Sequence, residues 1–356
     1  MKLKNVNFDT FNTETRQKNI ICVGAGRMLD DMFMLWDKSI TSRVAYIFDN
    51  NRKGTFICPD GRELSINKVE QIKDISLDES IILVTTLYCK SIYGQLDALL
   101  CEKDIDCYLY PAMSLKTTEF NIERKNDTQV IPKKIHYFWF GKGQMPEENV
   151  KCIESWKKYC PDYEIIKWTE DNFDITNCRY MQQAYESRRW GFVPDYARLD
   201  IVYQYGGIYL DTDVELVRNL DELLYQDAFA GFQRDFWVAL GLGFGSKPGN
   251  AIIKEMRDEY DKEEFIVEGG KLNLTASPYY QTKVLMRHGL KCNNQFQHVD
   301  GITIFPTEVL DPQGYSYGKI KLTDKSYSIH HYNESWVDTK QREENIKKYM
   351  ELDYFR

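Results

Sequence analysis

The central part of the chain reads Pro194-Asp-Tyr-Ala-Arg-Leu-Asp-Ile-Val-Tyr-Gln-Tyr-Gly-Gly-Ile-Tyr-Leu-Asp-Thr-Asp213. Leu199, Val202 and Tyr203 share one side of a helix that we predict for residues 194–205, and the two glycines that follow end it. The next three residues, Ile-Tyr-Leu, are apolar and predict a short buried strand. Such alternation of helix and strand is typical of an α/β domain.

Asp211 and Asp213 follow this predicted strand directly. Residues two apart in a strand face the same side, so we expect the two carboxylates to project together. Neighbouring carboxylates tolerate one another best across a divalent cation, and hard oxygen ligands favour Mg²⁺ or Mn²⁺ over zinc. A metal held there would bridge a diphosphate and stabilise the charge that it gains on leaving. Alone, however, a D-x-D pattern is more often a solvated turn.

The α/β pattern continues on both sides of this stretch. Strands are predicted near residues 131–141 and 163–168, with an amphipathic helix around residues 150–157 between them. We assign residues 131–356 to one domain and the polar, aperiodic residues 116–130 to a linker.

Residues 1–115 predict a small Rossmann-like domain, a parallel sheet with helices on both faces. Its apolar strands lie near residues 20–23, 44–48, 81–84 and 105–110.

A glycine turn, Gly24-Ala-Gly26, follows the first of these strands, and Asp49 ends the next strand where a ribose-binding acid would lie. The third glycine position of a dinucleotide-binding turn falls on Leu29. Asp30 and Asp31 follow in the first helical turn, where they would repel a pyrophosphate. We therefore favour a structural tight turn. The alternative function is an NAD-dependent oxidoreductase that modifies nucleotide sugars.

Composition excludes other classes of protein. The chain has 356 residues, 43% of them hydrophobic and 28% charged, which fits about two globular domains. Its net charge of −8 argues against a protein that binds nucleic acid through bulk charge. The nine cysteines form no C-x-x-C pair, which favours reduced, buried thiols. With no apolar leader or membrane-spanning run, we expect a cytoplasmic protein.

Three further groups of residues are candidates for a site. Asp195 and Arg198 share a face of the predicted helix, although Asp195 is equally explained as a first-turn helix acid. Trp139 lies at a strand-to-loop edge, where ligands of α/β sheets bind, or else belongs to the core. Residues 329–336 collect two of the five histidines with amide, carboxylate, hydroxyl and indole groups.

Five segments, in order along residues 131–336, resemble the D-x-D sugar transferases of glycosyltransferase family 32, which includes bacterial capsular polysaccharide transferases. They are Ile131-Pro-Lys-Lys-Ile-His-x-x-Trp139-x-Gly141, Ser155-Trp156 with Pro161-Asp-Tyr163 and Trp168, Asp195-Tyr-Ala-Arg198, Gly206 to Asp213, and His330 with Ser335-Trp336. The resemblance implies a GT-A-type nucleotide-diphospho-sugar transferase fold and transfer with retention of anomeric configuration. Residues 1–115 lie outside it.

The resemblance also implies roles. Trp139 would stack on the donor base, while Asp195 and Arg198 hold the sugar and the diphosphate. Asp211 would bind the ribose side and assist the metal, and Asp213 would be its principal ligand; these two aspartates are the expected catalytic residues. The segment that closes over metal and diphosphate would contribute His330, Asn333, Ser335 and Trp336. This chain has Ser277-Pro278 where the family often has Gly-Pro, so no acceptor role is carried over to that stretch.

The function expected from these residues is that of a metal-dependent retaining hexosyltransferase. Its cofactor would be Mn²⁺ or Mg²⁺, its donor a nucleotide-diphosphate sugar with a UDP-sugar favoured, and its acceptor a glycan or lipid-linked oligosaccharide in capsular or other surface polysaccharide synthesis. Peripheral association with the inner face of the membrane fits such an acceptor. A retaining transferase needs a carboxylate nucleophile or same-face attack; Asp235 and Glu215 are available, and neither is assigned. A binding or scaffold protein is the third class considered.

Overall fold

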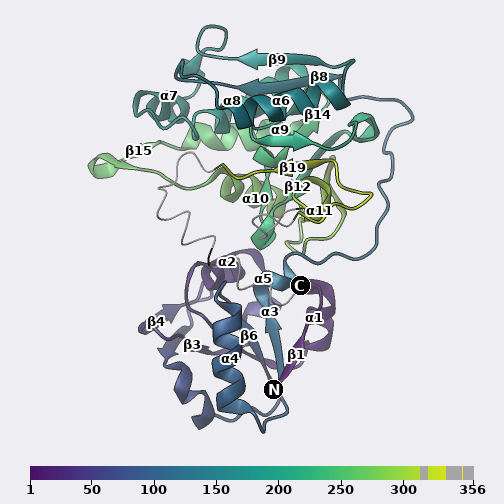
Figure 1. Ribbon diagram of the computed structural model, residues 1–356. Coiled ribbons are helices and arrows are strands. Elements are labelled where there is room, and N and C mark those ends of the chain that lie inside the picture. Colours follow the sequence, from purple (N-terminus) through teal and green to yellow (C-terminus); the bar gives the residue numbers. More distant parts are fainter. Residues whose placement is uncertain (313–319, 334–346, 348–356) are drawn as a thin grey trace.

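Two large sheets organise the chain, one above the other in Figure 1, in a computed structural model that describes residues 1–312, 320–333 and 347. The lower sheet is built from the first 109 residues and the upper from residues 134–305. This arrangement fits the predicted α/β class, with mixed sheets that contain parallel strands, as a GT-A-type fold requires. The division into domains at residues 115 and 131 stays a prediction.

The seven-stranded lower sheet has the order β1-β7-β6-β2-β3-β5-β4, and only the β4–β5 pair is antiparallel. Its strands are β1 (Lys2–Lys4), β2 (Asn19–Val23), β3 (Val44–Phe48), β4 (Gly54–Ile57), β5 (Glu63–Asn67), β6 (Ser80–Val84) and β7 (Asp106–Leu109). Its helices are α1 (Phe8–Glu14), α2 (Arg27–Leu35), α3 (Lys38–Thr41), α4 (Cys89–Leu100) and α5 (Tyr110–Met113). All four predicted strands are present, and β1, β4 and β5 are additions at the edges.

The eight-stranded upper sheet has the order β17-β18-β12-β14-β10-β8-β9, with β13 paired to β12. Its strands are β8 (Lys134–Phe138), β9 (Glu164–Trp168), β10 (Gly207–Tyr209), β12 (Ala228–Phe232), β13 (Val238–Ala239), β14 (Phe244–Ser246), β17 (Gln297–Val299) and β18 (Ile302–Phe305). β8 runs parallel to β9 and β10, and β12 runs parallel to β18. Two small sheets pair β11 (Val214–Leu216) with β19 (Ser328–His330) and β15 (Ile266–Val267) with β16 (Lys271–Leu272).

The helices around the upper sheet are α6 (Glu147–Tyr159), α7 (Arg179–Glu186), α8 (Pro194–Tyr205), α9 (Ala251–Asp258), α10 (Ser277–Arg287) and α11 (Thr307–Leu310). The helix predicted for residues 194–205 is confirmed as α8. Proline at its first position suits the helix start, and Gly206 ends it in the left-handed region at φ 62°. A Cβ at Gly206 would overlap Pro132 and Pro248. Unlike the one-sided helix predicted, α8 is buried on every side from Asp195 to Val202.

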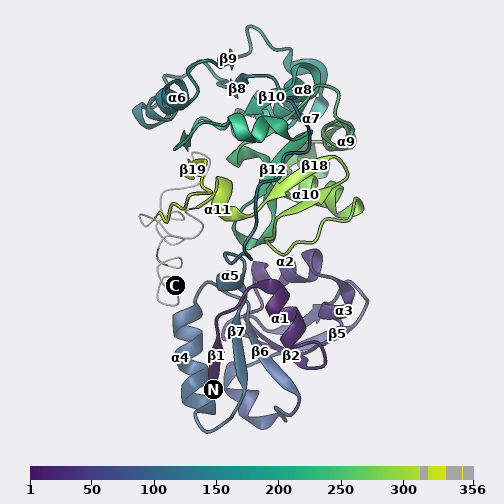
Figure 2. The same cartoon turned by 90° about the vertical axis from the view of Figure 1, so that its right-hand side faces the viewer.

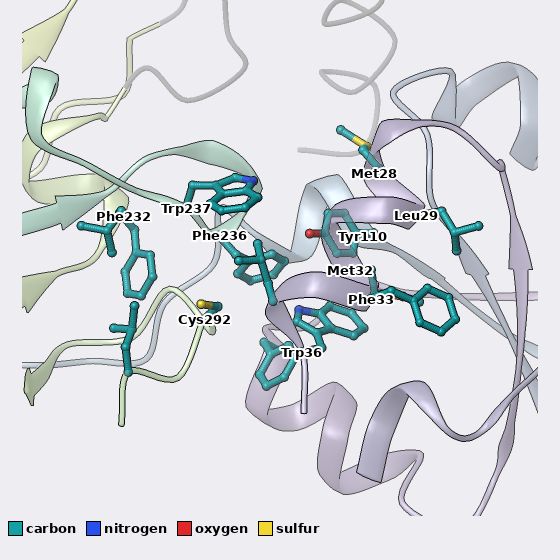
Figure 3. Close-up of a cluster of buried hydrophobic side chains, with 14 of the residues drawn as sticks. Met28, Leu29, Met32, Phe33, Trp36, Tyr110, Phe232, Phe236, Trp237 and Cys292 are labelled. Atoms are coloured by element: carbon teal, nitrogen blue, oxygen red, sulfur yellow. The ribbon is translucent and has the colours of Figure 1, made fainter. Parts of the chain in front are cut away.

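Aromatic side chains join the two sheets (Figure 3). Helices α2 and α5 lie at the top of the lower sheet and face the upper part of the molecule in both views (Figure 2). They present Trp36 and Tyr110 to the turn η4 (Arg234–Phe236), which follows β12, and the ring of Phe236 lies among them. Ligands of open α/β sheets bind at the carboxyl ends of the strands. Here the carboxyl edge of the lower sheet is covered by the upper part of the molecule, through η4.

The cysteines are free thiols in the part of the chain that the structure describes, all buried except Cys101, as the sequence predicts. Among the described residues, no helix combines the length and the apolar character needed to cross a membrane.

Candidate active site

The D-x-D residues lie in a turn and not in a strand. Strand β10 ends at Tyr209, β11 begins at Val214, and the Val214 amide donates to the Asp211 carbonyl at 3.0 Å. The prediction that strand alternation aligns the two carboxylates is therefore wrong. The tight turn brings them together instead.

Pairing between β11 and β19 brings the carboxyl-terminal histidine to this turn. Val214 is the register partner of His330, whose Nε2 lies 3.2 Å from Oδ1 of Asp213. The backbone amide of Asn333 donates to the other oxygen of Asp213 at 3.0 Å. The strand pairing thus unites residues that are more than a hundred positions apart in the sequence. Ser335 and Trp336 lie outside the described residues.

Asp211, Asp213 and His330 each offer one ligand atom, and these three atoms lie within 4.8 Å of one another. Two carboxylates with one imidazole are a donor set that Mn²⁺ or Mg²⁺ accepts, with further positions left for substrate oxygens. The residues present therefore fit the divalent cation expected from the sequence, with Asp213 and His330 as predicted ligands.

Asp213 and His330 each shift the pKa of the other. Burial on its own would raise the pKa of Asp213, but the His330 charge, its hydrogen bond and the Asn333 amide together lower that pKa well below its ordinary value. Burial would likewise lower the pKa of His330, and Asp213 raises it above its ordinary value. Each group thus favours the charged form of the other. A cation that takes His330 as a ligand must displace its proton.

A second buried network holds Asp211 from the side of α8. Arg198 forms an ion pair with Asp195, and its Nη1 lies 3.5 Å from Oδ1 of Asp211, to which the Tyr209 hydroxyl donates at 2.6 Å. Asp195 and Arg198 are 3% and 4% exposed, so this is no solvated helix acid. The structure therefore brings Asp195 and Arg198, which are predicted to hold the sugar and the diphosphate, next to the predicted metal ligands.

Ser277 and Gly241, for which the sequence predicts no role, also lie at this network. Burial raises the pKa of Asp195 to about 6, while Arg198 and a hydrogen bond from Ser277, at the start of α10, act to lower it. A Cβ on Gly241 would overlap Oδ2 of Asp211 and lie near Arg198. Neither follows a recognisable motif, because each is defined by a close approach between segments distant in sequence.

Trp139 follows β8, directly after the strand end. β8 pairs in parallel with β10, with Tyr209 opposite His136, so Trp139 and Asp211 follow the carboxyl ends of neighbouring strands. The indole of Trp139 is half-buried and donates to the Gly143 carbonyl at 2.7 Å. It is therefore an edge residue and no core residue, as its predicted role in stacking requires.

The other residues of the five segments support the site without facing it. The Trp156 indole donates to the Val214 carbonyl at 2.7 Å, and the Ser155 hydroxyl accepts from the Leu216 amide at 2.9 Å, which fixes β11. His136 is buried between the Trp168 indole and the Gly206 carbonyl, and burial lowers its pKa to about 4. It is a neutral structural histidine.

In the lower sheet, Asp49 closes the glycine turn. Its carboxylate accepts from the Ala25 amide at 2.7 Å and from the amides of Asn51 and Arg52. The acid that would bind a ribose is therefore engaged with the turn itself, and a Cβ on Gly24 would overlap the Thr85 carbonyl. These contacts favour the structural tight turn over the dinucleotide site.

Of the two carboxylates available as nucleophiles, Glu215 has a side-chain partner, whereas Asp235 forms hydrogen bonds through its backbone. Glu215 lies 2.9 Å from His331 Nε2. Asp235 lies at the junction of the two sheets, where its amide donates to Ser114 at 3.4 Å and its carbonyl accepts from Tyr110 at 3.5 Å.

Residues 146–230 match a family described as a glycosyltransferase sugar-binding region containing a DXD motif. Inositol phosphoceramide mannosyltransferase 3 of Schizosaccharomyces pombe is 37% identical over 108 residues, 29% of this chain and 30% of that protein. The mannosyltransferase 1 of the same organism is 25% identical over 182 residues, 47% and 55% of the two chains. Subversion of eukaryotic traffic protein A of Legionella pneumophila is 30% identical over 189 residues, 44% of this chain and 28% of that protein.

The chain thus spans between 28% and 55% of the length of these relatives. The matches confirm the predicted D-x-D glycosyltransferase region over residues 146–230. Among solved structures, the PaToxG glycosyltransferase is 20% identical with a TM-score of 0.36, over 46% of this chain and 71% of that one. A glycosyltransferase involved in glycosylation of the PBCV-1 major capsid is 11% identical with a TM-score of 0.31, over 60% of this chain and 98% of that one.

Proposed function

We propose that this chain is a metal-dependent retaining glycosyltransferase that moves a hexose from a nucleotide-diphosphate sugar to a glycan or lipid-linked acceptor. The observation that carries the proposal is the convergence of Asp211, Asp213 and His330 within 4.8 Å, beside the buried Asp195–Arg198 pair. A UDP-sugar remains the favoured donor. Because several relatives are named mannosyltransferases, mannose belongs among the first sugars to test.

A bound divalent cation would supply the positive charge that offsets the leaving diphosphate. Asp213 and His330 would hold it, with Asp211 as a third ligand. Arg198 is a buried cation already fixed by Asp195 and Asp211. A charge that is oriented before the reaction stabilises developing negative charge without reorganisation at the moment of bond breaking. We assign Trp139 to the donor base and Asp195 to the sugar.

The biological setting proposed is capsular or other surface polysaccharide synthesis. The protein would act in the cytoplasm, in peripheral contact with the inner face of the membrane where a lipid-linked acceptor is found. The acidic net charge of −8 argues against a role in nucleic-acid binding through bulk charge.

The test is hydrolysis of a panel of UDP- and GDP-sugars with Mn²⁺, Mg²⁺ or EDTA. We expect turnover of at least one donor with metal and none in EDTA. Asp213→Asn should abolish that turnover, whereas the matched Asp171→Asn should not, because Asp171 is an exposed acid that pairs with Lys142 on the surface. Full turnover in EDTA, or an active Asp213→Asn enzyme, would refute the proposal.

A further inference from the structure

The turn η4 connects the junction of the two sheets with the active site. Its outer residue, Phe236, is fully buried against the lower sheet. Its ring lies 5.2 Å from that of Tyr110 and 5.9 Å from those of Trp36 and Phe8, in edge-to-face geometry (Figure 3). One side of the turn is thus fixed by residues from the first 110 positions.

The inner residue of the turn, Arg234, is fixed on the other side. Its guanidinium lies over the ring of Tyr332 at 4.3 Å from the centroid, and its backbone amide donates to Oδ2 of Asp311 at 3.4 Å. The Tyr332 hydroxyl donates to the same oxygen at 2.7 Å. Arg234 and Asp311 therefore hold Tyr332 from both the face and the edge of its ring.

Tyr332 lies between His330 and Asn333, which both contact the Asp213 carboxylate. Its ring packs edge-to-face on the His330 imidazole at 4.2 Å between centroids, and the next residue, Asn333, donates its amide to Asp213. Movement of Tyr332 therefore moves both partners of the expected metal ligand.

The backbone at these contacts requires support. Asp235, Phe236 and Tyr332 have φ of 71°, 68° and 48°, a left-handed conformation that residues other than glycine adopt at a cost. Such residues persist where the surrounding packing fixes them. Here that packing comes from the lower sheet for η4, and from η4 for Tyr332.

We propose that Arg234 is a positioning residue, through which the lower sheet, docked on Phe236, holds residues 330–333 against Asp213 and so sets the affinity of the site for its cation. The inference rests on the proposed function and deepens it. It assigns the first 110 residues a part in cation binding without any contact with the cation.

Mn²⁺ binding to the full-length protein, followed by electron paramagnetic resonance of the free ion, tests this without reference to turnover. We expect Arg234→Gln to weaken Mn²⁺ binding about tenfold or more and Arg234→Lys to restore part of it. Phe236→Leu, a change where η4 packs on the lower sheet, should also weaken Mn²⁺ binding. The matched control is Arg257→Gln, because Arg257 also lies over a tyrosine, Tyr203, at 4.7 Å and pairs with Asp200 at 3.1 Å. We expect unchanged affinity there.

Hydrogen exchange at the Asn333 amide gives a second readout, and we expect it to accelerate in Arg234→Gln and not in Arg257→Gln. If Arg234→Gln fails to fold, Tyr332→Phe removes the hydroxyl contact with Asp311 and should weaken Mn²⁺ binding by a smaller factor. Unchanged Mn²⁺ affinity in the folded Arg234 or Tyr332 variant would overturn the positioning role alone. Absence of Mn²⁺ binding by the unsubstituted protein would overturn both this inference and the proposed metal dependence.

Discussion

Replacement of Asp235 by asparagine should change how the stability of the protein depends on pH. The carboxylate is enclosed at the junction of the two sheets, and its Oδ1 has no hydrogen-bond partner within the described ranges. Burial raises its pKa from an ordinary 3.8 to about 7, against the opposing effect of Arg234 and with a smaller contribution from Asp31. The folded protein therefore keeps a proton on Asp235 that the unfolded chain loses near pH 4.

Because the folded state binds more protons over this interval, stability falls as pH rises from about 4 to about 7 and levels off above. A pKa of about 7 against 3.8 corresponds to about 4 kcal/mol in total. Between about pH 5.5 and pH 8 the share lost is about 2 kcal/mol. Asparagine carries no charge, so Asp235→Asn should lose this share of the pH dependence and be more stable than the unsubstituted protein at pH 8.

Urea unfolding followed by tryptophan fluorescence measures this directly, because Trp36 and Trp237 both lie buried at the junction. Asp31, whose pKa burial raises to about 6, titrates in the same window, so some pH dependence should remain in the single variant. Asp171→Asn, on the surface, is the control. Equal free energies of unfolding for Asp235→Asn and the unsubstituted protein at pH 8 would refute the reasoning.

Three further changes test other parts of the structure. Gly241→Ala should abolish transfer with little loss of thermal stability, because the added Cβ displaces the Asp211 carboxylate; a fully active variant in a turnover assay would contradict this contact. Trp139→Ala should weaken donor binding in calorimetry by about 1–3 kcal/mol, the range for aromatic stacking on bases. Unchanged affinity with a lowered melting temperature would show that Trp139 stabilises the fold and does not bind the donor. A chain that begins at Lys116 should self-associate in size-exclusion chromatography, because Phe236 and Trp237 lose their cover; a well-behaved monomer would speak against the aromatic junction.

Local patterns predicted the parts of the fold that depend on near neighbours in sequence. The helix from Pro194 to Tyr205 and its glycine end were predicted to the residue, because proline and glycine act through their own backbone. The two aspartates were correctly paired, but for the wrong reason, since the strand ends at Tyr209, one residue before the end of its apolar run, and the aspartates lie in the turn that follows.

Parts of the site that depend on tertiary contacts were not predictable. Gly241 and Ser277 approach Asp211 and Asp195 only because α10 and the loop before β14 fold over α8. The aromatic junction was missed as well, since Trp36 and Tyr110 look like ordinary core residues of their own sheet until Phe236 is placed between them. The edge strands β1 and β4 were missed because they are only three and four residues long and partly exposed.

The aromatic junction also imposes an order on synthesis. Tyr110 leaves the ribosome about 126 residues before Phe236, and Trp36 leaves earlier still. At about 5–20 residues per second, the delay after Tyr110 is some 6–25 s. Throughout that interval the lower sheet is complete while its aromatic docking face has no cover. Neighbouring nascent chains on one messenger would present identical faces to one another. Translation speed between codons 110 and 236 therefore governs how long each chain is vulnerable to pairing with another copy before it closes on itself.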